Sequence, residues 1–388
     1  MMIYDIIIVG AGPAGLMAAR HLSKANMNFL VIDSKKEIGK PLRCGEGIRE
    51  KEFLEFFKHK NYSFIENLVT EHEVIYKKFI RRFKENFFQL NRTKFEKWLA
   101  KNLGKKLKLG TACKDIKIKK NNAEVITSKG IFKTRMVILA NGCNFELQKK
   151  FGLVRKRPNI VVGYGGIYRI NKINPNKFYY FFDDRYLGYL WIFPKSNNLA
   201  NIGFGAANVK NPGKVLRELL GKFGIKGKQL VQYVGIIPCL GPINKTYYDR
   251  LLVCGTAAGH VYAGTGEGIY YALKSGQIAA QTATKAVEKN RFDTSFLKRY
   301  EKEWKKTFGK QMKAGIIFAD LLYLGFKFKR LKELFKQPTE KELRAMIIKG
   351  EIPFRARIAW YTARLFNLKN KEKIPSVLKI IARKIISS

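Results

Sequence analysis

A glycine-rich turn between two apolar segments constrains the fold more than any other feature of this 388-residue sequence. Residues 5–9 form a continuous β-branched apolar run, which is typical of a buried strand. Residues 16–22 continue as a helix with an apolar face, and a second strand predicted over 29–32 ends at Asp33. The turn between them has the spacing Gly-x-Gly-x-x-Gly, at Gly10, Gly12 and Gly15. This order predicts one βαβ unit of Rossmann type.

Each glycine of this motif has a separate physical role. Gly10 permits the tight turn, Gly12 lets the backbone approach a pyrophosphate, and Gly15 lets helix and strand pack closely. The helix that follows presents free N–H groups and the positive end of its dipole to the phosphates. Asp33 is expected to accept hydrogen bonds from the adenosine ribose hydroxyls. The motif in this context therefore predicts a dinucleotide-binding fold.

Two later segments indicate FAD as the dinucleotide. Strands are predicted over 136–139 and 251–254, and the second ends in a glycine-rich turn that contains Thr256. Another glycine-rich helix start follows at Gly268 and Ile269. A dinucleotide fold that returns to its sheet so late in the chain is the arrangement of two-domain flavoproteins. The positive end of this second helix would stabilise negative charge on the reduced flavin.

Three aromatic side chains alternate along one predicted strand. Tyr189, Trp191 and Phe193 are spaced two residues apart and therefore share one face. Such a face forms an apolar wall that suits a long hydrocarbon chain. The same pattern is also typical of ordinary sheet core packed against a helix. A neighbouring aromatic strand is predicted over 178–182, and the pattern alone leaves both interpretations open.

The charge of the chain is unusual, because 75 lysine and arginine residues stand against 30 aspartate and glutamate residues. The formal net charge of +45 favours polyanionic partners: nucleic acid, an anionic membrane or phosphorylated substrates. The basic residues form no single dense block, and the sequence contains no nucleic-acid recognition motif, so nucleic acid is disfavoured. A charged, solvated surface without a partner is the alternative interpretation.

Cysteine, histidine and hydropathy patterns narrow the class of protein further. The five cysteines and four histidines are scattered without a CxxC pair, so we expect neither a disulfide framework nor a metal site. The apolar run over 314–326 contains Asp320 and is shorter than the roughly 20 residues that cross a bilayer. No signal peptide is visible, and a cytoplasmic location is therefore expected.

Several motifs together make the chain similar to the geranylgeranyl reductase family, whose members are flavoproteins with a para-hydroxybenzoate-hydroxylase-like fold. The motifs are the N-terminal glycine turn, Arg43-Cys44-Gly45-Glu46-Gly47, Asn91-Arg92, the segment 255–269, and Tyr189-Leu190-Trp191-Ile192-Phe193-Pro194 followed after eight residues by Gly203-Phe204-Gly205. The resemblance covers roughly residues 3–281. It implies an α/β fold, α+β overall, with a Rossmann-type FAD-binding domain, an inserted antiparallel β-sheet substrate domain and C-terminal helices.

The resemblance also implies domain boundaries. We expect a discontinuous FAD-binding domain over 1–50, 85–150 and 245–295, a substrate-binding domain over 51–84 and 151–244, and a C-terminal helical region over 296–388.

The expected site residues follow from the same motifs. Those expected to bind the cofactor are Gly10, Gly12, Ala14, Gly15, Asp33, Cys44, Gly45, Gly47, Arg92, Cys113, Thr256, Gly268 and Ile269. Those expected to bind substrate are Tyr189, Trp191, Phe193, Gly203 and Gly205. Cys44, in a loop that the resemblance places against the flavin, is the expected proton donor. The chain departs from the family in having Thr256 where aspartate is usual and Ala263 near a usual proline, and threonine hydrogen-bonds more weakly than a carboxylate.

The activity implied is FAD-dependent reduction of isolated C=C bonds in the geranylgeranyl chains of archaeal-type membrane ether phospholipids. The electron donor would be ferredoxin or NAD(P)H. The cofactor supplies a hydride, whereas the protein supplies a dry pocket, orientation and a proton. One alternative is an FAD-dependent monooxygenase of the same fold that acts on an aromatic or quinone precursor. Another is a flavin-binding protein that has lost redox chemistry.

The C-terminal region is predicted to be helical and basic. Apolar residues alternate with lysines over 296–313, a capping box begins at Thr339, and residues 376–386 carry an apolar stripe. Basic amphipathic helices suit a membrane interface, although such helices more often cover a core. We expect them to dock on anionic lipid, with the protein peripheral at the inner face of the membrane. His260 and Tyr262 either line the flavin cavity or pack within their loop.

Overall fold

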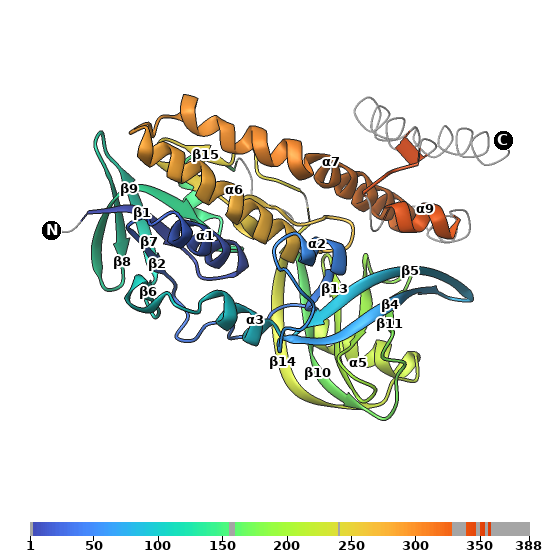
Figure 1. Ribbon diagram of the computed structural model, residues 1–388. Coiled ribbons are helices and arrows are strands. Elements are labelled where there is room, and N and C mark those ends of the chain that lie inside the picture. Colours follow the sequence, from blue (N-terminus) through green and yellow to red (C-terminus); the bar gives the residue numbers. More distant parts are fainter. Residues whose placement is uncertain are drawn as a thin grey trace.

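The computed structural model describes residues 3–154, 160–239, 241–327, 339–346, 350–353 and 356–357. Within these ranges the strands form two sheets of eight strands each. Figure 1 shows the two sheets in different halves of the molecule, with two long helices, α6 and α7, above the first sheet and α7 extending over the second. The structure therefore has the expected α/β character with an added antiparallel sheet.

The first sheet is built on the predicted βαβ unit. Its order is β15-β16-β9-β1-β2-β6, and the antiparallel strands β7 and β8 extend it from β9. The strands are β1 (Ile3–Val9), β2 (Phe29–Ile32), β6 (Leu107–Lys108), β7 (Cys113–Ile118), β8 (Ala123–Thr127), β9 (Gly130–Leu139), β15 (Tyr247–Tyr248) and β16 (Leu251–Val253). Parallel pairing of β1 with β2 and β9, and of β9 with β16, confirms the late return of the chain to its first sheet.

Two helices pack on this sheet through positions where only glycine fits. α1 (Pro13–Lys24) and α6 (Ile269–Glu288) lie together, and a Cβ at Gly276 of α6 would be 2.2 Å from the carbonyl oxygen of Ala14. This close approach requires a residue without a side chain. The start of α6 at Ile269 is the helix start that the sequence predicts.

The 34-residue helix α7 (Thr294–Lys327) packs along α6 and buries its apolar face. Its buried side chains include Phe296, Leu297, Tyr300, Trp304 and Phe308. The apolar residues of the stretch 296–313 therefore cover the core. This agrees with the alternative interpretation, in which such helices cover a core rather than bind a membrane. The predicted stripe over 376–386 lies outside the described residues.

The second sheet has the order β14-β10-β13-β12-β11-β4-β5-β3. Its strands are β3 (Gly47–Arg49), β4 (Ile65–Tyr76), β5 (Phe79–Leu90), β10 (Ile160–Ile170), β11 (Lys177–Phe182), β12 (Gly188–Pro194), β13 (Leu199–Ala206) and β14 (Gly227–Pro238). All pairs are antiparallel except β4 with β11. The chain passes into the second sheet at Gly47, where β3 begins, and leaves it again at Leu90, where β5 ends. The boundaries between the two sheets therefore lie near these residues. The expected division into domains stays a prediction.

Shorter helices connect the two sheets or cover their faces. They are α2 (Glu50–Leu54), α3 (Arg92–Leu99), α4 (Glu146–Lys150), α5 (Pro212–Lys222), α9 (Glu340–Arg344) and the 3₁₀ turns η1 (Gly104–Lys106) and η2 (Gly255–Ala258). The predicted capping box at Thr339 is confirmed, because its side chain and that of Glu342 bond each other's backbone N–H groups. Across the described ranges, no helix combines the length and the apolar character that crossing a bilayer requires.

The contact between α1 and α6 generates a stability prediction. Gly276→Ala should lower the free energy of unfolding by about 1–3 kcal/mol, because backbone must move to admit the methyl group. Gly221→Ala, in α5, is the control, since nothing lies within 4 Å of its Cβ position. That change should leave stability unchanged or raise it by up to about 1 kcal/mol. Urea unfolding compares the variants, and equal midpoints would contradict the prediction.

Candidate active site

The glycine turn lies where β1 ends, and its backbone has the form that the predicted roles require. Gly10 has a φ of +110°, and a Cβ there would lie 2.2 Å from the carbonyl oxygen of Ala140. A Cβ at Gly15 would lie 1.9 Å from the carbonyl oxygen of Gly10. No atom lies within 4 Å of the Cβ position of Gly12, so the outer side of the turn is open to a ligand. The turn therefore fits a pyrophosphate.

Helices α1 and α6 both begin without a side-chain cap. Neither the N-cap Gly12 of α1 nor the N-cap Gly268 of α6 supplies a capping side chain. By contrast, asparagine side chains cap α3 and α5 at Asn91 and Asn211. The first N–H groups and the positive dipole ends of α1 and α6 thus remain available to an anionic ligand. This arrangement fits FAD, with its pyrophosphate at α1 and its flavin near α6.

Asp33 connects the end of β2 to the glycine turn. Its buried carboxylate accepts the N–H of Ala11 at 2.6 Å and the N–H of Lys35 at 2.8 Å. Each carboxylate oxygen can accept more than one hydrogen bond, so the ribose hydroxyls remain possible partners. Thr111 donates its N–H to the Asp33 carbonyl at 2.8 Å, which brings the start of β7 at Cys113 beside this group. Binding of adenosine here stays a prediction.

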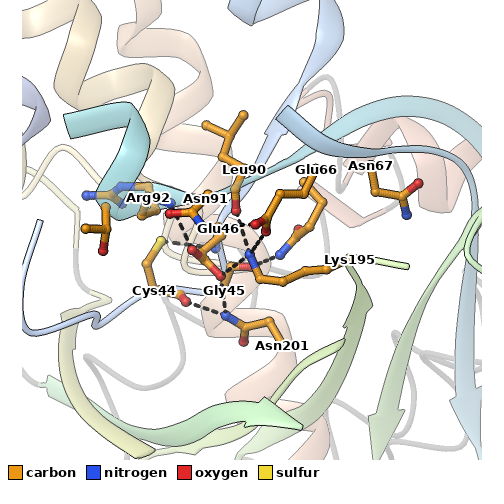
Figure 2. Close-up of polar contacts among 12 residues, drawn as sticks. Cys44, Gly45, Glu46, Glu66, Asn67, Leu90, Asn91, Arg92, Lys195 and Asn201 are labelled. Atoms are coloured by element: carbon orange, nitrogen blue, oxygen red, sulfur yellow. Dashed lines mark hydrogen bonds and ion pairs between the residues drawn. The ribbon is translucent and has the colours of Figure 1, made fainter. Parts of the chain in front are cut away.

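Glu46 holds the loop that leads from Cys44 to Gly47. Its backbone has a φ of +73°, and its side chain is almost completely buried. One carboxylate oxygen accepts the N–H of Arg92 at 2.9 Å. The other accepts from Asn201 Nδ2 at 3.0 Å and contacts Lys195 Nζ at 2.7 Å (Figure 2). The loop is therefore bound both to the start of α3 and to the second sheet.

Lys195 and Asn201 extend this network. The ammonium group of Lys195 also contacts Glu66 Oε2 at 2.5 Å and donates to the carbonyl of Leu90 at 2.8 Å (Figure 2). Asn201 donates to the Cys44 carbonyl at 2.8 Å and accepts from Trp191 Nε1 at 3.0 Å. The predicted cofactor loop and the predicted substrate strand are thus linked by one amide. The sequence motifs did not indicate a role for Lys195 or Asn201. Their position was the available signal, because Lys195 directly follows the aromatic motif and Asn201 lies between that motif and the glycines of β13.

The expected flavin-contacting arginine, Arg92, has its guanidinium group mostly buried beside Glu96, with which it forms an ion pair. Within the described chain its Nε has no hydrogen-bond partner. Cys44 Sγ accepts the N–H of Glu46 at 3.2 Å. The roles of Arg92 and Cys44 toward a flavin stay predictions.

The alternating aromatic residues share one face of β12, as predicted. The Tyr189 and Trp191 ring centroids lie 6.1 Å apart, and those of Trp191 and Phe193 lie 6.3 Å apart. The indole lies over Gly203, where a Cβ would be only 2.2 Å from Trp191 Cζ2. The glycines of β13 therefore make room for this ring.

An apolar cavity of about 340 Å³ lies against this aromatic face. Of the five residues expected to bind substrate, Tyr189, Trp191 and Gly205 line it, whereas Phe193 and Gly203 do not. Phe193 packs against Phe178 instead, at a centroid distance of 4.2 Å. Residues 263–266, the second half of α7 and residues of β10, β11 and β14 supply other parts of its wall. The apolar run over 314–326 therefore contributes to the cavity wall, a role that its sequence did not predict.

The loop beneath α7 packs tightly. His260 is fully buried, with its ring centroid 4.7 Å from that of Trp304, and burial lowers its pKa to about 3. Tyr262 donates its hydroxyl to the carbonyl of Met346. Neither is among the residues that line this cavity; His260 packs against α7 and Tyr262 bonds the backbone at Met346. Ala263 does line it, and a Cβ at Gly315 of α7 would lie 2.9 Å from the Ala263 nitrogen.

Thr256, which replaces the usual aspartate, lies in η2 between the starts of α1 and α6. Its neighbour Gly255 has a φ of +64°, and a Cβ there would lie 2.7 Å from the Cβ of Ala14. The Gly255 N–H donates to Ser275 Oγ at 2.9 Å. The threonine therefore occupies the expected place, and its contact with a cofactor stays a prediction.

Comparison with known proteins agrees with this geometry. The family model described as pyridine nucleotide-disulphide oxidoreductase matches residues 7–155. A geranylgeranyl bacteriochlorophyll reductase-like protein from Thermoplasma acidophilum superposes with a TM-score of 0.79 at 23% identity, covering 98% of this chain and all of that one. A flavin-dependent brominase superposes with a TM-score of 0.69 at 16% identity, covering 95% of this chain and all of that one. Fold and site define an FAD-dependent oxidoreductase.

Sequence relatives narrow this class. The digeranylgeranylglycerophospholipid reductase of Methanocaldococcus jannaschii is 32% identical over 326 residues, which cover 78% of this chain and 83% of the relative. The protein of the same name from Methanococcus vannielii is 28% identical and covers 97% of both chains. The chain belongs to the digeranylgeranylglycerophospholipid reductase family. The resemblance that the motifs indicated is therefore confirmed.

The buried network generates a prediction for Lys195. Lys195→Met should lower the free energy of unfolding by about 3–5 kcal/mol, because it leaves the buried Glu46 carboxylate without its cation. The double variant Glu46→Gln/Lys195→Met removes both charges and should recover part of this loss. Urea unfolding provides the measurement. A single variant as stable as the wild type, or a double variant less stable than the single one, would contradict the prediction.

Proposed function

We propose that this protein reduces isolated C=C bonds in the geranylgeranyl chains of an archaeal-type ether phospholipid, using FAD. The observation that carries the proposal is the apolar cavity between the aromatic face of β12, the loop over 263–266 and α7. That loop leads directly into the uncapped start of α6, where the flavin is expected. The printed name of the relatives, digeranylgeranylglycerophospholipid reductase, supports the same substrate class.

The lining of the cavity suits a hydrocarbon. It consists mainly of aliphatic, aromatic and glycine residues, and Asp320 is the one charged side chain among its described members. Each methylene group transferred from water to such a lining contributes about 0.8 kcal/mol. An aromatic hydroxylation substrate would require several polar side chains in the cavity to orient it. This mainly apolar lining favours a prenyl chain instead.

The residues of the chain have separate tasks in this reaction. The glycine turn and Asp33 would hold the adenosine and pyrophosphate end of FAD, which when bound supplies a hydride. Trp191 and Tyr189 would orient the alkene and exclude water from it. An isolated alkene is a poor hydride acceptor, so the protein must also supply a proton. Cys44 stays a candidate donor, although it is not among the lining residues that the structure describes. The electron donor would be ferredoxin or NAD(P)H.

We further propose that the protein contacts an anionic membrane surface at the inner face of the membrane. Two residues that line the cavity, Ile160 and Tyr323, are also 42% and 45% exposed, so an apolar rim surrounds its opening. The edge strand β14, which pairs with β10, also exposes Val234 and Ile236. The net charge of +45 complements anionic lipid. A lipid tail would enter the cavity from this side.

The first test is an anaerobic single turnover. Protein reduced with dithionite is expected to be reoxidised by digeranylgeranylglyceryl phospholipid, with the lipid gaining two hydrogens per turnover. Gly203→Ala should slow this step on the order of 100-fold, since displacement of a positioning group by about 1 Å has such effects. Gly221→Ala, in α5 and away from the cavity, is the control, because nothing lies within 4 Å of its Cβ position. Flavin absorbance and lipid mass are measured.

The outcomes of this test are distinct. A reduced flavin that stays reduced with unchanged lipid would contradict the proposal. Rapid NAD(P)H oxidation with a hydroxylated aromatic product would favour the monooxygenase alternative.

The membrane proposal is tested by sedimentation with liposomes. The protein should pellet with anionic vesicles more than with neutral ones at low salt, and added salt should weaken this binding. Val234→Ser/Ile236→Ser should lower the bound fraction several-fold because it removes exposed apolar area. Ile131→Ser is the control, since Ile131 is equally exposed on β9 of the first sheet. Equal pelleting with both kinds of vesicle would contradict the proposal.

A further inference from the structure

Arg49, at the end of β3, is shared by two carboxylates from different elements. Its Nη2 contacts Oε1 of Glu52 in α2 and lies 3.9 Å from Oε2 of Glu267, in the turn before α6. The exposed fractions of these three side chains are 8%, 14% and 24%. One buried cation therefore faces two largely buried anions. Full ionisation of both carboxyl groups would leave an uncompensated charge in a low-dielectric site.

Glu267 is the less compensated of the two carboxyl groups. Glu52 is in direct contact with Arg49, whereas the distance to Glu267 exceeds that of a hydrogen bond. Among the described residues, the other groups that face Glu267 are Glu52, Thr265, Glu85 of β5 and the tyrosines at 180, 189, 262 and 271, none of which is a cation. Burial raises the pKa of Glu267, and it raises the pKa of Glu52 to about 7. Burial therefore favours the protonated form of these carboxyl groups.

A hydroxyl group connects Glu267 with the cavity. Thr265 Oγ1 lies 3.1 Å from Glu267 Oε1, in hydrogen-bond contact, and Thr265 lines the cavity. The backbone holds this residue in place, because the Thr265 carbonyl accepts the hydroxyl of Tyr189 at 2.5 Å. The Tyr262 N–H also donates to the Glu267 carbonyl at 2.8 Å. The carboxyl group, the hydroxyl and the aromatic wall therefore keep a defined arrangement.

We propose that Glu267 stores the proton that the reduction consumes and delivers it through the hydroxyl of Thr265. This inference rests on the proposed function. FAD, when bound and reduced, would supply the hydride for one new C–H bond, and Thr265 Oγ1 would donate the proton for the other. That oxygen receives the Glu267 proton in the same step, so the alkene gains two hydrogens and two electrons in total. The carboxylate that remains is stabilised by Arg49, and solvent returns its proton.

The relay makes specific predictions for single-turnover rates. Glu267→Gln keeps the shape of the side chain but removes its acid, and Thr265→Val removes the hydroxyl. Each should slow flavin reoxidation by lipid on the order of 100-fold or more, the usual contribution of a general acid. Thr265→Ser should stay close to the wild type because it restores the hydroxyl. Cys44→Ala removes the competing candidate donor, and a loss of rate confined to that variant would assign the proton to Cys44 instead.

The dependence on pH distinguishes a proton donor from a structural residue. The wild-type rate should fall as the pH rises through the raised pKa of Glu267, and the residual rate of Glu267→Gln should not show this fall. Glu52→Gln removes a competing anion, so Arg49 would lower the pKa of Glu267. The fall in rate should then occur at a lower pH. A profile unchanged in both variants would overturn the inference.

Infrared difference spectroscopy provides a measurement that does not depend on turnover. At neutral pH the protein should show a carboxylic acid C=O band that is absent in Glu267→Gln and present in Glu124→Gln, a surface carboxylate paired with Lys119. Absence of this band would overturn the inference. So would wild-type rates in Glu267→Gln and Thr265→Val, or loss of the rate in Cys44→Ala alone. Failure of the wild type to reduce the lipid would overturn the proposed function and this inference together.

Discussion

The buried carboxylate of Glu46 holds the expected flavin loop against the second sheet, which carries the aromatic wall of the cavity. It accepts a backbone N–H from the start of α3 and contacts Lys195 and Asn201 of the second sheet. Asn201 in turn binds the Cys44 carbonyl and the indole of Trp191. One buried network therefore fixes the expected flavin loop relative to the aromatic wall. Buried polar groups satisfied in this way are costly to disturb, which gives the site a single geometry.

Two buried clusters in the protein each combine one cation with two carboxylates, and their geometries have different consequences. The ammonium group of Lys195 lies within 2.7 Å of both of its carboxylates and also donates to a carbonyl, so both carboxylates are in direct contact with the cation. Arg49 contacts only one of its two carboxylates directly. The first cluster therefore pairs both of its carboxylates directly, whereas the second leaves Glu267 beyond hydrogen-bond distance of its cation, where burial raises its pKa.

The fold itself is shared with flavoproteins of other activities, as the likeness to a flavin-dependent brominase shows. Chemistry on such a fold depends on what lines the cavity beside the cofactor. Here α7 contributes one wall, because glycines allow it to lie directly on the loop at 263–266. A Cβ at Gly264 would be 2.2 Å from Phe318 of α7. The helix thus buries one apolar face on the core and completes an apolar cavity farther along its length.

The sequence by itself determined the features that depend on neighbouring residues: the βαβ unit with its glycine turn, the shared face of Tyr189, Trp191 and Phe193, and the capping box at Thr339. Local sterics and strand alternation suffice for these. Only the tertiary structure decided which aromatic residues reach the cavity, that His260 is buried, and that Lys195, Asn201 and Glu267 have polar partners. Partners such as Glu46 for Lys195 and Arg49 for Glu267 are far apart in the chain, because burial and charge compensation depend on packing between elements rather than on local pattern.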